Sequence, residues 1–266
     1  MHVTITKYRD LQEILTHYRA GIYEILLLEG RPGTGKSTIV RQAFSDLPST
    51  HLLWLEGRIT AAKLYELLYQ YQDRYIVIDD SQGFLADKQC TDLLKSLCNT
   101  SQKDKQVSWS TTRKLPEGIP RSFPTASQVI LIGNTTGSKL HIHTEALADR
   151  GVHILFTPTR EELHTYARSI TDPTVYGWIE KYMPFLQETD LSLRTYMILS
   201  RMQERGIYWI ESFCQFFQLS EAVKCYIEVD MLYPSYSKTE QKQVWESKSQ
   251  LPDAQFDRIA DMLERA

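Results

Sequence analysis

A glycine-rich stretch near the amino terminus, GRPGTGKS at residues 30–37, matches the pattern G-x-x-x-x-G-K-[ST]. Backbone N–H groups can surround a chain of phosphates only where no side chain blocks them and where some residues adopt positive φ, and glycine meets both demands. Lys36 adds a mobile positive charge for the outer phosphates, and the Ser37 hydroxyl can ligate Mg²⁺. The stretch therefore predicts a binding site for a chain of phosphates and its magnesium ion.

The segments on either side of this stretch are those that such a loop needs. Residues 23–30, YEILLLEG, predict a buried strand, and residues 36–44, KSTIVRQAF, predict a helix with an apolar face. The helix would direct its free N–H groups and its positive dipole end toward the bound anion. We expect the nucleotide to contact Gly30, Arg31, Pro32, Gly33, Thr34, Gly35, Lys36, Ser37 and Thr38.

Two adjacent carboxylates, Asp79 and Asp80, follow the apolar run of residues 75–78. Such a run predicts a parallel strand that is buried on both faces. Carboxylates are costly in a core but useful at the edge of an α/β sheet where ligands bind. We expect Asp79 to hold the Mg²⁺ shell beside Ser37, and Asp80 to polarise the attacking water.

Further strands and helices are expected to position these residues. Strands predicted at residues 50–57, 128–136 and 151–158 alternate with helices predicted at residues 60–71 and 88–99. Strands that alternate with helices favour a parallel sheet with right-handed crossover connections. The fold class expected from the pattern is therefore α/β.

Two polar residues next to these strands are candidates for contacts with the terminal phosphate. Asn134 is expected at the same sheet edge as Asp79, where it would orient the water or touch the γ-phosphate, although Asn also forms turns. Arg150 ends a short helix predicted over residues 144–151. An exposed guanidinium at that place suits a phosphate on a neighbouring molecule. The alternative is that Arg150 complements the dipole of its own helix.

From residue 158 onward the pattern changes to helices separated by Pro or Gly. Residues 158–232 predict a compact helical bundle. One helix is expected to begin with Asp190 as its N-cap, and its Arg194 is then a second candidate for reaching the nucleotide. The alternative for Arg194 is a surface ion pair with Glu180 or Glu188.

The last part of the chain, residues 233–266, is polar and ends in an amphipathic helix. Phe256, Ile259 and Leu263 form the apolar face of that helix, which packs on its own bundle or docks on a protein partner. We therefore expect three segments: a core domain at residues 1–157, a helical domain at residues 158–232 and a helical tail at residues 233–266.

The composition excludes some classes of protein. With 30 Lys and Arg against 33 Asp and Glu, the net charge is about −3, which does not suit a protein that coats nucleic acid. The four cysteines have no CxxC spacing, which favours reduced thiols and a cytoplasmic location. We find no apolar run typical of a signal peptide or a membrane-spanning helix and expect no membrane partner.

The ordered set GRPGTGKS, YIVIDD, VILIGNTT, ALADRG and LSLRTYM resembles the motifs of the AAA+ ATPases. That resemblance implies a P-loop parallel sheet sandwiched by helices and followed by a helical lid domain. It implies that residues 30–38 are Walker A and that Asp79 and Asp80 are Walker B. By the same resemblance Asn134 would be sensor 1. Arg150 would be the arginine finger and Arg194 would be sensor 2.

The resemblance also implies an activity and an assembly. The activity is Mg²⁺-dependent ATP hydrolysis by a homo-oligomeric ring or spiral with nucleotide at each subunit interface. Its catalytic residues would be Lys36, Asp80, Asn134, Arg150 and Arg194. Many members have Glu where this chain has the shorter Asp80. Within the superfamily the chain is similar to small AAA ATPases of bacteriophages and related mobile elements.

The target of such an ATPase is left open by the sequence. A predicted loop before residue 124 carries Trp109 and a group of basic residues, an arrangement that can track a nucleic-acid backbone or simply be a solvated loop. The basic residues are Lys103, Lys105, Arg113, Lys114 and Arg121. One function is an ATPase that loads or remodels a partner on DNA, as in replication or recombination. The alternatives are a protein-remodelling ATPase, an ATP-gated scaffold with little hydrolysis and a monomeric small-molecule kinase.

Overall fold

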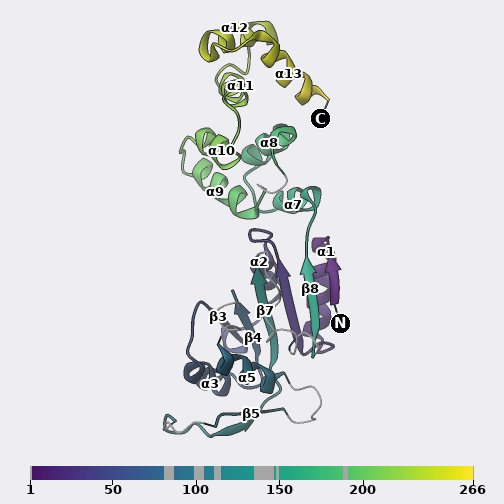
Figure 1. The fold of residues 1–266 in the computed structure, drawn as a ribbon, viewed down its shortest axis with the longest axis vertical. Coiled ribbons are helices and arrows are strands. Elements are labelled where there is room, and N and C mark those ends of the chain that lie inside the picture. Colours follow the sequence, from purple (N-terminus) through teal and green to yellow (C-terminus); the bar gives the residue numbers. More distant parts are fainter. Residues whose placement is uncertain are drawn as a thin grey trace. The chain divides into compact units, whose positions relative to one another are not determined.

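The computed structural model describes residues 2–80, 87–98, 105–110, 115–134, 147, 150–187 and 191–265. The chain divides into two compact units, Met1–Thr159 and Arg160–Ala266. Figure 1 shows strands and helices in the first unit and helices in the second. The boundary lies two residues after the one expected from the sequence, and the second unit includes residues 233–266.

The first unit is built on a six-stranded parallel sheet with the strand order β1-β8-β2-β7-β4-β3. The strands are β1 (His2–Ile5), β2 (Ile25–Gly30), β3 (Leu52–Glu56), β4 (Tyr75–Asp79), β7 (Gln128–Asn134) and β8 (Val152–Phe156). All strands run in one direction, so their carboxyl ends meet at one edge of the sheet. This confirms the expected parallel α/β architecture.

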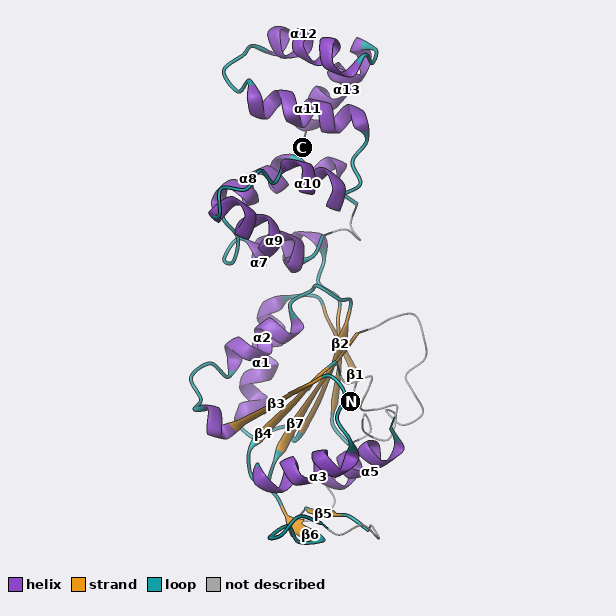
Figure 2. Ribbon diagram, turned by 90° about the vertical axis from the view of Figure 1, so that its left-hand side faces the viewer, coloured by secondary structure: helices purple, strands orange, loops and turns teal. Residues whose placement is uncertain are grey.

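Helices cover both faces of the sheet. In Figure 2, α1 (Tyr8–Arg19) and α2 (Lys36–Ala43) lie on one face, and α3 (Ala61–Gln70) and α5 (Lys88–Leu97) lie on the other. The central strands are almost entirely buried, because successive side chains alternate between the two helical layers. This double covering explains why these strands read as continuous apolar runs.

Some elements of the first unit were not expected from the sequence. Strand β1 and helix α1 precede the glycine-rich stretch, and a short 3₁₀ helix (Ser49–His51) precedes β3. A two-stranded antiparallel hairpin, β5 (Gln106–Ser108) with β6 (Ser122–Pro124), lies where we expected only a loop. Val107 and Phe123 are buried against the core of α3 and α5, which anchors the hairpin. The helix predicted over residues 144–151 falls largely outside the described residues.

Helices are the regular secondary structure found in the described residues of the second unit. Its helices are α7 (Arg160–Ala167), α8 (Pro173–Lys181), a 3₁₀ turn (Met183–Phe185), α9 (Leu193–Glu204), α10 (Ile210–Phe216), α11 (Glu221–Leu232), α12 (Lys238–Ser249) and α13 (Asp253–Glu264). The expected N-cap of α9 was wrong. The Ser192 side chain accepts the N–H of Thr195, so α9 begins two residues later than an Asp190 cap would place it. Asp190 itself lies outside the described residues.

The apolar face of α13 packs inside its own unit. Phe256 is buried, with ring centroids 4.9 Å from Tyr226 of α11 and 5.8 Å from Trp245 of α12. Ile259 is also buried. Of the two alternatives for this face, packing on the bundle therefore holds, and these two side chains are not available to a partner. No helix in the described part of the chain has the length and apolar character needed to span a membrane.

Candidate functional site

The glycine-rich loop joins the carboxyl end of β2 to the first residue of α2. Gly33 and Gly35 have φ of 79° and 82°, in the left-handed region that side chains disfavour. Gly35 is the N-cap of α2, so the loop bends sharply as it enters the helix. The backbone N–H groups of this turn are not covered by side chains at the two glycines. This is the local geometry that an anion-binding loop requires.

Gly30 is required by strand packing. A Cβ atom at this position would lie 2.3 Å from the carbonyl oxygen of Phe156, which is its register partner on β8. The close approach brings β8 and β2 together directly below the loop. The first glycine of the motif therefore has a structural reason that does not depend on a ligand.

Lys36, the first residue of α2, is buried with 5% of its surface exposed. Its Nζ donates to the carbonyl oxygens of Gly30 at 2.8 Å and Arg31 at 2.9 Å, and to Oδ1 of Asn134 at 3.1 Å. Burial lowers the pKa of Lys36 to about 8, against a smaller opposite effect of Asp79. A buried cation held mainly by neutral acceptors is suited to an anionic ligand that would replace them.

The pair expected to hold magnesium is in contact. The Ser37 hydroxyl donates to Oδ1 of Asp79 at 3.0 Å, and the same oxygen accepts the backbone N–H of Asp80 at 3.0 Å. Strand β7 lies between β2 and β4, so Asn134 is placed between the loop and Asp79. A hydroxyl, a carboxylate and an amide at one edge form a set of oxygen donors suited to Mg²⁺.

Asp80 leaves the end of β4 in an unusual conformation. Its φ is 55°, in the left-handed region, which Asp adopts more readily than most residues. Its side chain is exposed. Strand β4 ends at Asp79, so Asp80 is not part of the strand. The role of Asp80 in polarising water stays a prediction.

Arg150 does not have the full exposure that we expected. The residue is half-buried, and its Nη1 atom is buried without a hydrogen-bond partner among the described residues. It lies near Cys98: burial raises the pKa of that thiol to about 12, although the charges of Lys105 and Arg150 favour the thiolate. Arg150 directly precedes Gly151, which abuts Ile25 at the start of β2. It therefore lies at the amino ends of the strands, at the edge of the sheet opposite to Lys36.

Arg194 belongs to the second unit, where it is exposed in the first turn of α9. Its predicted contact with a nucleotide stays a prediction. Of the two ion-pair partners considered for it, Glu188 lies outside the described residues. The other, Glu180, lies near His164, with 3.7 Å between its Oε1 atom and Nε2 of the histidine.

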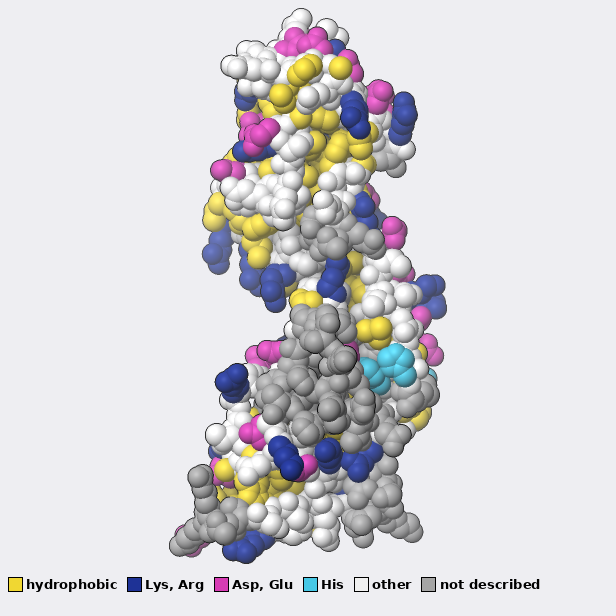
Figure 3. All heavy atoms as spheres, viewed as in Figure 1, with side chains coloured by type: hydrophobic (Ala, Val, Ile, Leu, Met, Phe, Trp, Pro, Cys, Tyr) yellow, Lys and Arg dark blue, Asp and Glu magenta, His cyan; other side chains and the backbone are white. Residues whose placement is uncertain are grey.

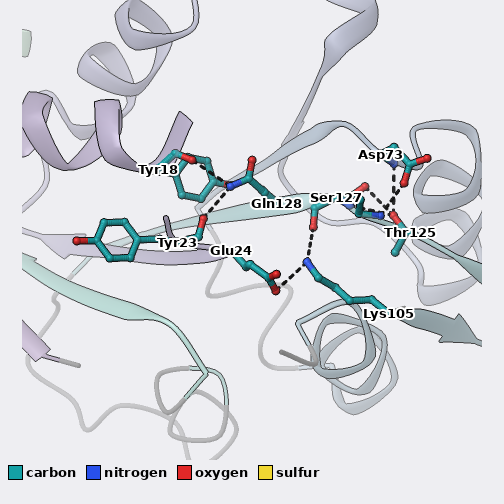
Figure 4. A network of polar contacts seen from close by, with 9 residues as sticks. Tyr18, Tyr23, Glu24, Asp73, Lys105, Thr125, Ser127 and Gln128 are labelled. Atoms are coloured by element: carbon teal, nitrogen blue, oxygen red, sulfur yellow. Dashed lines mark hydrogen bonds and ion pairs between the residues drawn. The ribbon is translucent and has the colours of Figure 1, made fainter. Parts of the chain in front are cut away.

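One basic residue of the predicted nucleic-acid patch, Lys105, is not on the surface. Lys105 is buried, lies 2.9 Å from a Glu24 carboxylate oxygen and donates to the Ser127 carbonyl at 3.1 Å, as drawn in Figure 4. The expectation that Lys105 contacts nucleic acid was wrong, because the chain folds it back onto the amino ends of β2 and β7. In the same network Gln128 donates to the main-chain carbonyls of Tyr18, near the end of α1, and of Tyr23, just before β2.

The remaining residues of that patch have different surroundings. Arg121 is exposed, whereas Trp109 packs edge-on against Tyr65 with ring centroids 5.4 Å apart. Lys103, Arg113 and Lys114 lie outside the described residues. Figure 3 shows Lys and Arg side chains at several places on the face that it draws.

Two contacts near the loop were not found by sequence reasoning. The Tyr8 hydroxyl of α1 donates to the carbonyl of Thr34 in the loop at 2.9 Å. Glu56, the last residue of β3, contacts Arg41 of α2. No sequence pattern near Tyr8 predicts its contact with the loop, because Tyr8 and Thr34 are 26 residues apart in the sequence. A signal for Glu56 existed, since a carboxylate ends the predicted strand at residues 50–57 just as Asp79 ends the next strand.

Any assignment of function to this chain rests on the contacts described above, because comparisons with known proteins do not provide one. No protein-family model matches the chain, and a search of curated proteins finds no match.

Proposed function

We propose that the chain is an oligomeric, Mg²⁺-dependent ATPase of the AAA+ type that binds the triphosphate of ATP at residues 30–38. The observation that carries this proposal is the convergence of Lys36, Ser37 and Asp79 at the mouth of the glycine-rich loop. The loop provides backbone N–H groups, Lys36 provides a positive charge, and the hydroxyl–carboxylate pair provides oxygen ligands for a metal ion.

Each of these residues has a distinct task in binding. Lys36 Nζ would exchange its contacts with the Gly30 carbonyl and the Asn134 amide for phosphate oxygens. Ser37 and Asp79 would hold Mg²⁺, whose chemistry is to neutralise the negative charge that develops on the transferred phosphoryl group. Tyr8 steadies the loop through the carbonyl of Thr34. The protein therefore contributes mainly positioning and charge.

For hydrolysis, Asp80 and Asn134 would orient the attacking water. Arg150 of an adjoining copy would add positive charge at the γ-phosphate, since Arg150 of the same chain lies at the opposite edge of the sheet. The second candidate function is an ATP-gated scaffold with little hydrolysis. It is favoured by the exposed, short side chain of Asp80 and by the partly buried guanidinium of Arg150.

An Asp80→Asn variant separates these two functions. In an ATPase the variant should bind ATP as the wild type does but hydrolyse it roughly 10²-fold more slowly or worse, because general-base help at the water is lost. The measurement is phosphate release alongside equilibrium ATP binding. Wild-type turnover no faster than that of the variant would favour the scaffold.

The partner of the ATPase is a further proposal. We propose that it loads or remodels a partner in a DNA transaction such as replication or recombination. The support is the exposed Arg121, whose backbone carbonyl accepts the backbone N–H of Trp109. A protein-remodelling ATPase is the alternative. Stimulation of ATP hydrolysis by DNA, and loss of that stimulation as salt is raised, would favour the first.

A further inference from the structure

A second contact between α2 and the sheet lies beside the Ser37–Asp79 pair. Ser37 and Arg41 are four residues apart, so they lie on the same face of α2. Asp79 and Glu56 are the last residues of β4 and β3 and are partners in the strand register. The Ser37 hydroxyl donates to Asp79, and the Arg41 guanidinium donates to Glu56. Helix α2 is therefore tied to two neighbouring strand ends by two successive contacts one helical turn apart.

The outer contact includes a third side chain. The guanidinium carbon of Arg41 lies 3.8 Å from the centroid of the Trp54 ring. The Trp54 indole N–H donates to Oε1 of Glu56 at 2.7 Å. Trp54 and Glu56 are two residues apart on β3, so both project toward α2. Arg41 is thus held by a flat ring on one side and by a carboxylate at its end, and we refer to these three residues as the Arg41 cluster.

Stability alone gives a weak reason for this cluster. The Arg41 and Glu56 side chains are 53% and 58% exposed. An exposed ion pair contributes about 0–1 kcal/mol, and an exposed cation–π contact about 0.5–1 kcal/mol. What the geometry does provide is a second point of attachment between α2 and the sheet, one turn after Ser37.

We infer that Arg41, Trp54 and Glu56 position the Ser37 hydroxyl against Asp79 and thereby set the affinity of the site for Mg²⁺. The inference rests on the proposed function, because it concerns the metal of that same site. Mg²⁺ accepts only near-octahedral geometry with ligands at about 2.0–2.1 Å. A small rotation of α2 would move the Ser37 hydroxyl away from Asp79, with which it would hold Mg²⁺, although the backbone of the glycine-rich loop would still bind phosphate. The three residues are positioning residues, since the contacts that define the cluster are among Arg41, Trp54 and Glu56 themselves.

The test is the Mg²⁺ concentration needed for half-maximal tightening of ATP binding, measured with a fluorescent ATP analogue. The Arg41→Ala variant should need roughly tenfold more Mg²⁺ than the wild type, in line with the loss of a residue that orients a metal ligand. Its affinity for ATP in excess chelator should stay within about twofold of the wild type, because phosphate contacts are untouched. Arg41→Lys, which keeps the cation, should recover part of the Mg²⁺ affinity.

Two further variants guard against a simple folding defect. Trp54→Phe keeps an aromatic ring under Arg41 but removes the N–H donor to Glu56, so it should raise the Mg²⁺ requirement less than Arg41→Ala. The matched control is Lys63→Ala, which breaks another exposed ion pair, with Glu66 on α3. The control should leave the Mg²⁺ requirement unchanged.

Three results would overturn the inference. One is an unchanged Mg²⁺ requirement in both Arg41→Ala and Trp54→Phe. Another is an equal loss of ATP affinity with and without Mg²⁺, which would mean a general structural role. The third is a wild-type chain that binds no ATP or ignores Mg²⁺, and this result also overturns the proposed function. If the wild type binds ATP more tightly with Mg²⁺ but the variants give one of the first two results, only the inference fails and the proposed function stands.

Discussion

At the scale of single residues, Lys36 has the most informative surroundings in the candidate site. Its Nζ is directed at two loop carbonyls and the Asn134 amide, and its burial favours the neutral amine. Because its pKa is lowered from 10.5 to about 8, the unfolded chain binds more protons than the folded chain between those values. Burying Lys36 therefore destabilises the ligand-free fold below about pH 8, and this cost declines as the pH rises toward 10.5.

This leads to a prediction for ATP binding. A bound triphosphate would favour the charged form of Lys36 and raise its pKa, so the protein should take up protons when it binds ATP near pH 8.5, about half a unit above the ligand-free value. Uptake should be much smaller near pH 7, about one unit below that value, where Lys36 is already protonated. Titration calorimetry in two buffers of different ionisation enthalpy measures the number of protons.

The control for this prediction is Lys36→Arg, which stays charged at both pH values. Any proton uptake that it retains near pH 8.5 comes from other groups and is subtracted. Equal uptake in the wild type and this variant would mean that Lys36 does not meet the phosphates.

Also at residue scale, the sequence predicted contacts that lie within or close to a motif. Lys36 and Ser37 could be placed because the spacing of glycines dictates the loop, and Asp79 because a carboxylate ends an apolar strand. The burial of Lys105 could not be predicted, because its partner Glu24 lies far away in the sequence, directly before β2. Arg41 gave no signal of its own, since an exposed basic residue on a helix usually has no partner in the sheet.

At the scale of elements, the central strands were predictable and the short ones were not. Strands β2, β4 and β7 are covered by helices on both faces, and this covering imposes a continuous apolar run. Strand β1 is at the sheet edge and only Ile5 of its four residues is buried, so it has no continuous apolar run. Strands β5 and β6 are three residues each and contribute one buried side chain apiece.

The packing of helices α7, α8 and α9 leads to a second pH prediction. His164 of α7 stacks on Tyr176 of α8 and shares a hydrogen bond of 2.8 Å with the Tyr196 hydroxyl of α9. Burial lowers the pKa of His164, although the carboxylate of Glu180 works in the opposite direction and Arg160 adds a smaller lowering effect. Neutral His164 is therefore the form that suits this packing.

The sign of the effect follows from linkage. Because the folded chain holds His164 neutral, the unfolded chain binds more protons as the pH falls through the ordinary histidine pKa of 6.5. The second unit should therefore lose stability between about pH 7.5 and about pH 5.5, and urea midpoints of the full chain measure the loss. His164→Gln removes the titrating ring, so its midpoint should change less over this interval. A larger change in the variant would contradict the assignment.

At the scale of the whole molecule, the proposed role of Arg150 at the γ-phosphate would need a second copy of the chain. The glycine-rich loop follows the carboxyl end of β2, whereas Arg150 precedes the amino end of β8, and the two strands are parallel. Within the first unit of one chain, Arg150 and the loop therefore lie at opposite edges of the sheet. A contact between them requires an adjoining molecule.

The prediction is that Arg150→Ala keeps ATP binding but loses hydrolysis by about 10³-fold or more. Mixing it with Asp80→Asn subunits should restore part of the activity, because the second protein supplies an intact Arg150 to the first protein's intact Asp80. Arg150→Lys is the control for stability, since it keeps a cation near the Cys98 thiol. Activity that never recovers on mixing would argue for a purely structural role of Arg150.

The most direct test of the central claim is equilibrium binding of ATP to the full chain, with Mg²⁺ and with excess chelator. The claim is that the residues around Lys36 and Ser37 bind a triphosphate with its magnesium ion. We predict saturable binding by the wild type that is tighter with Mg²⁺, and loss of tight binding in Lys36→Ala but not in Lys63→Ala. Equal affinity of the wild type and Lys36→Ala for ATP, or no binding by either, would contradict the claim.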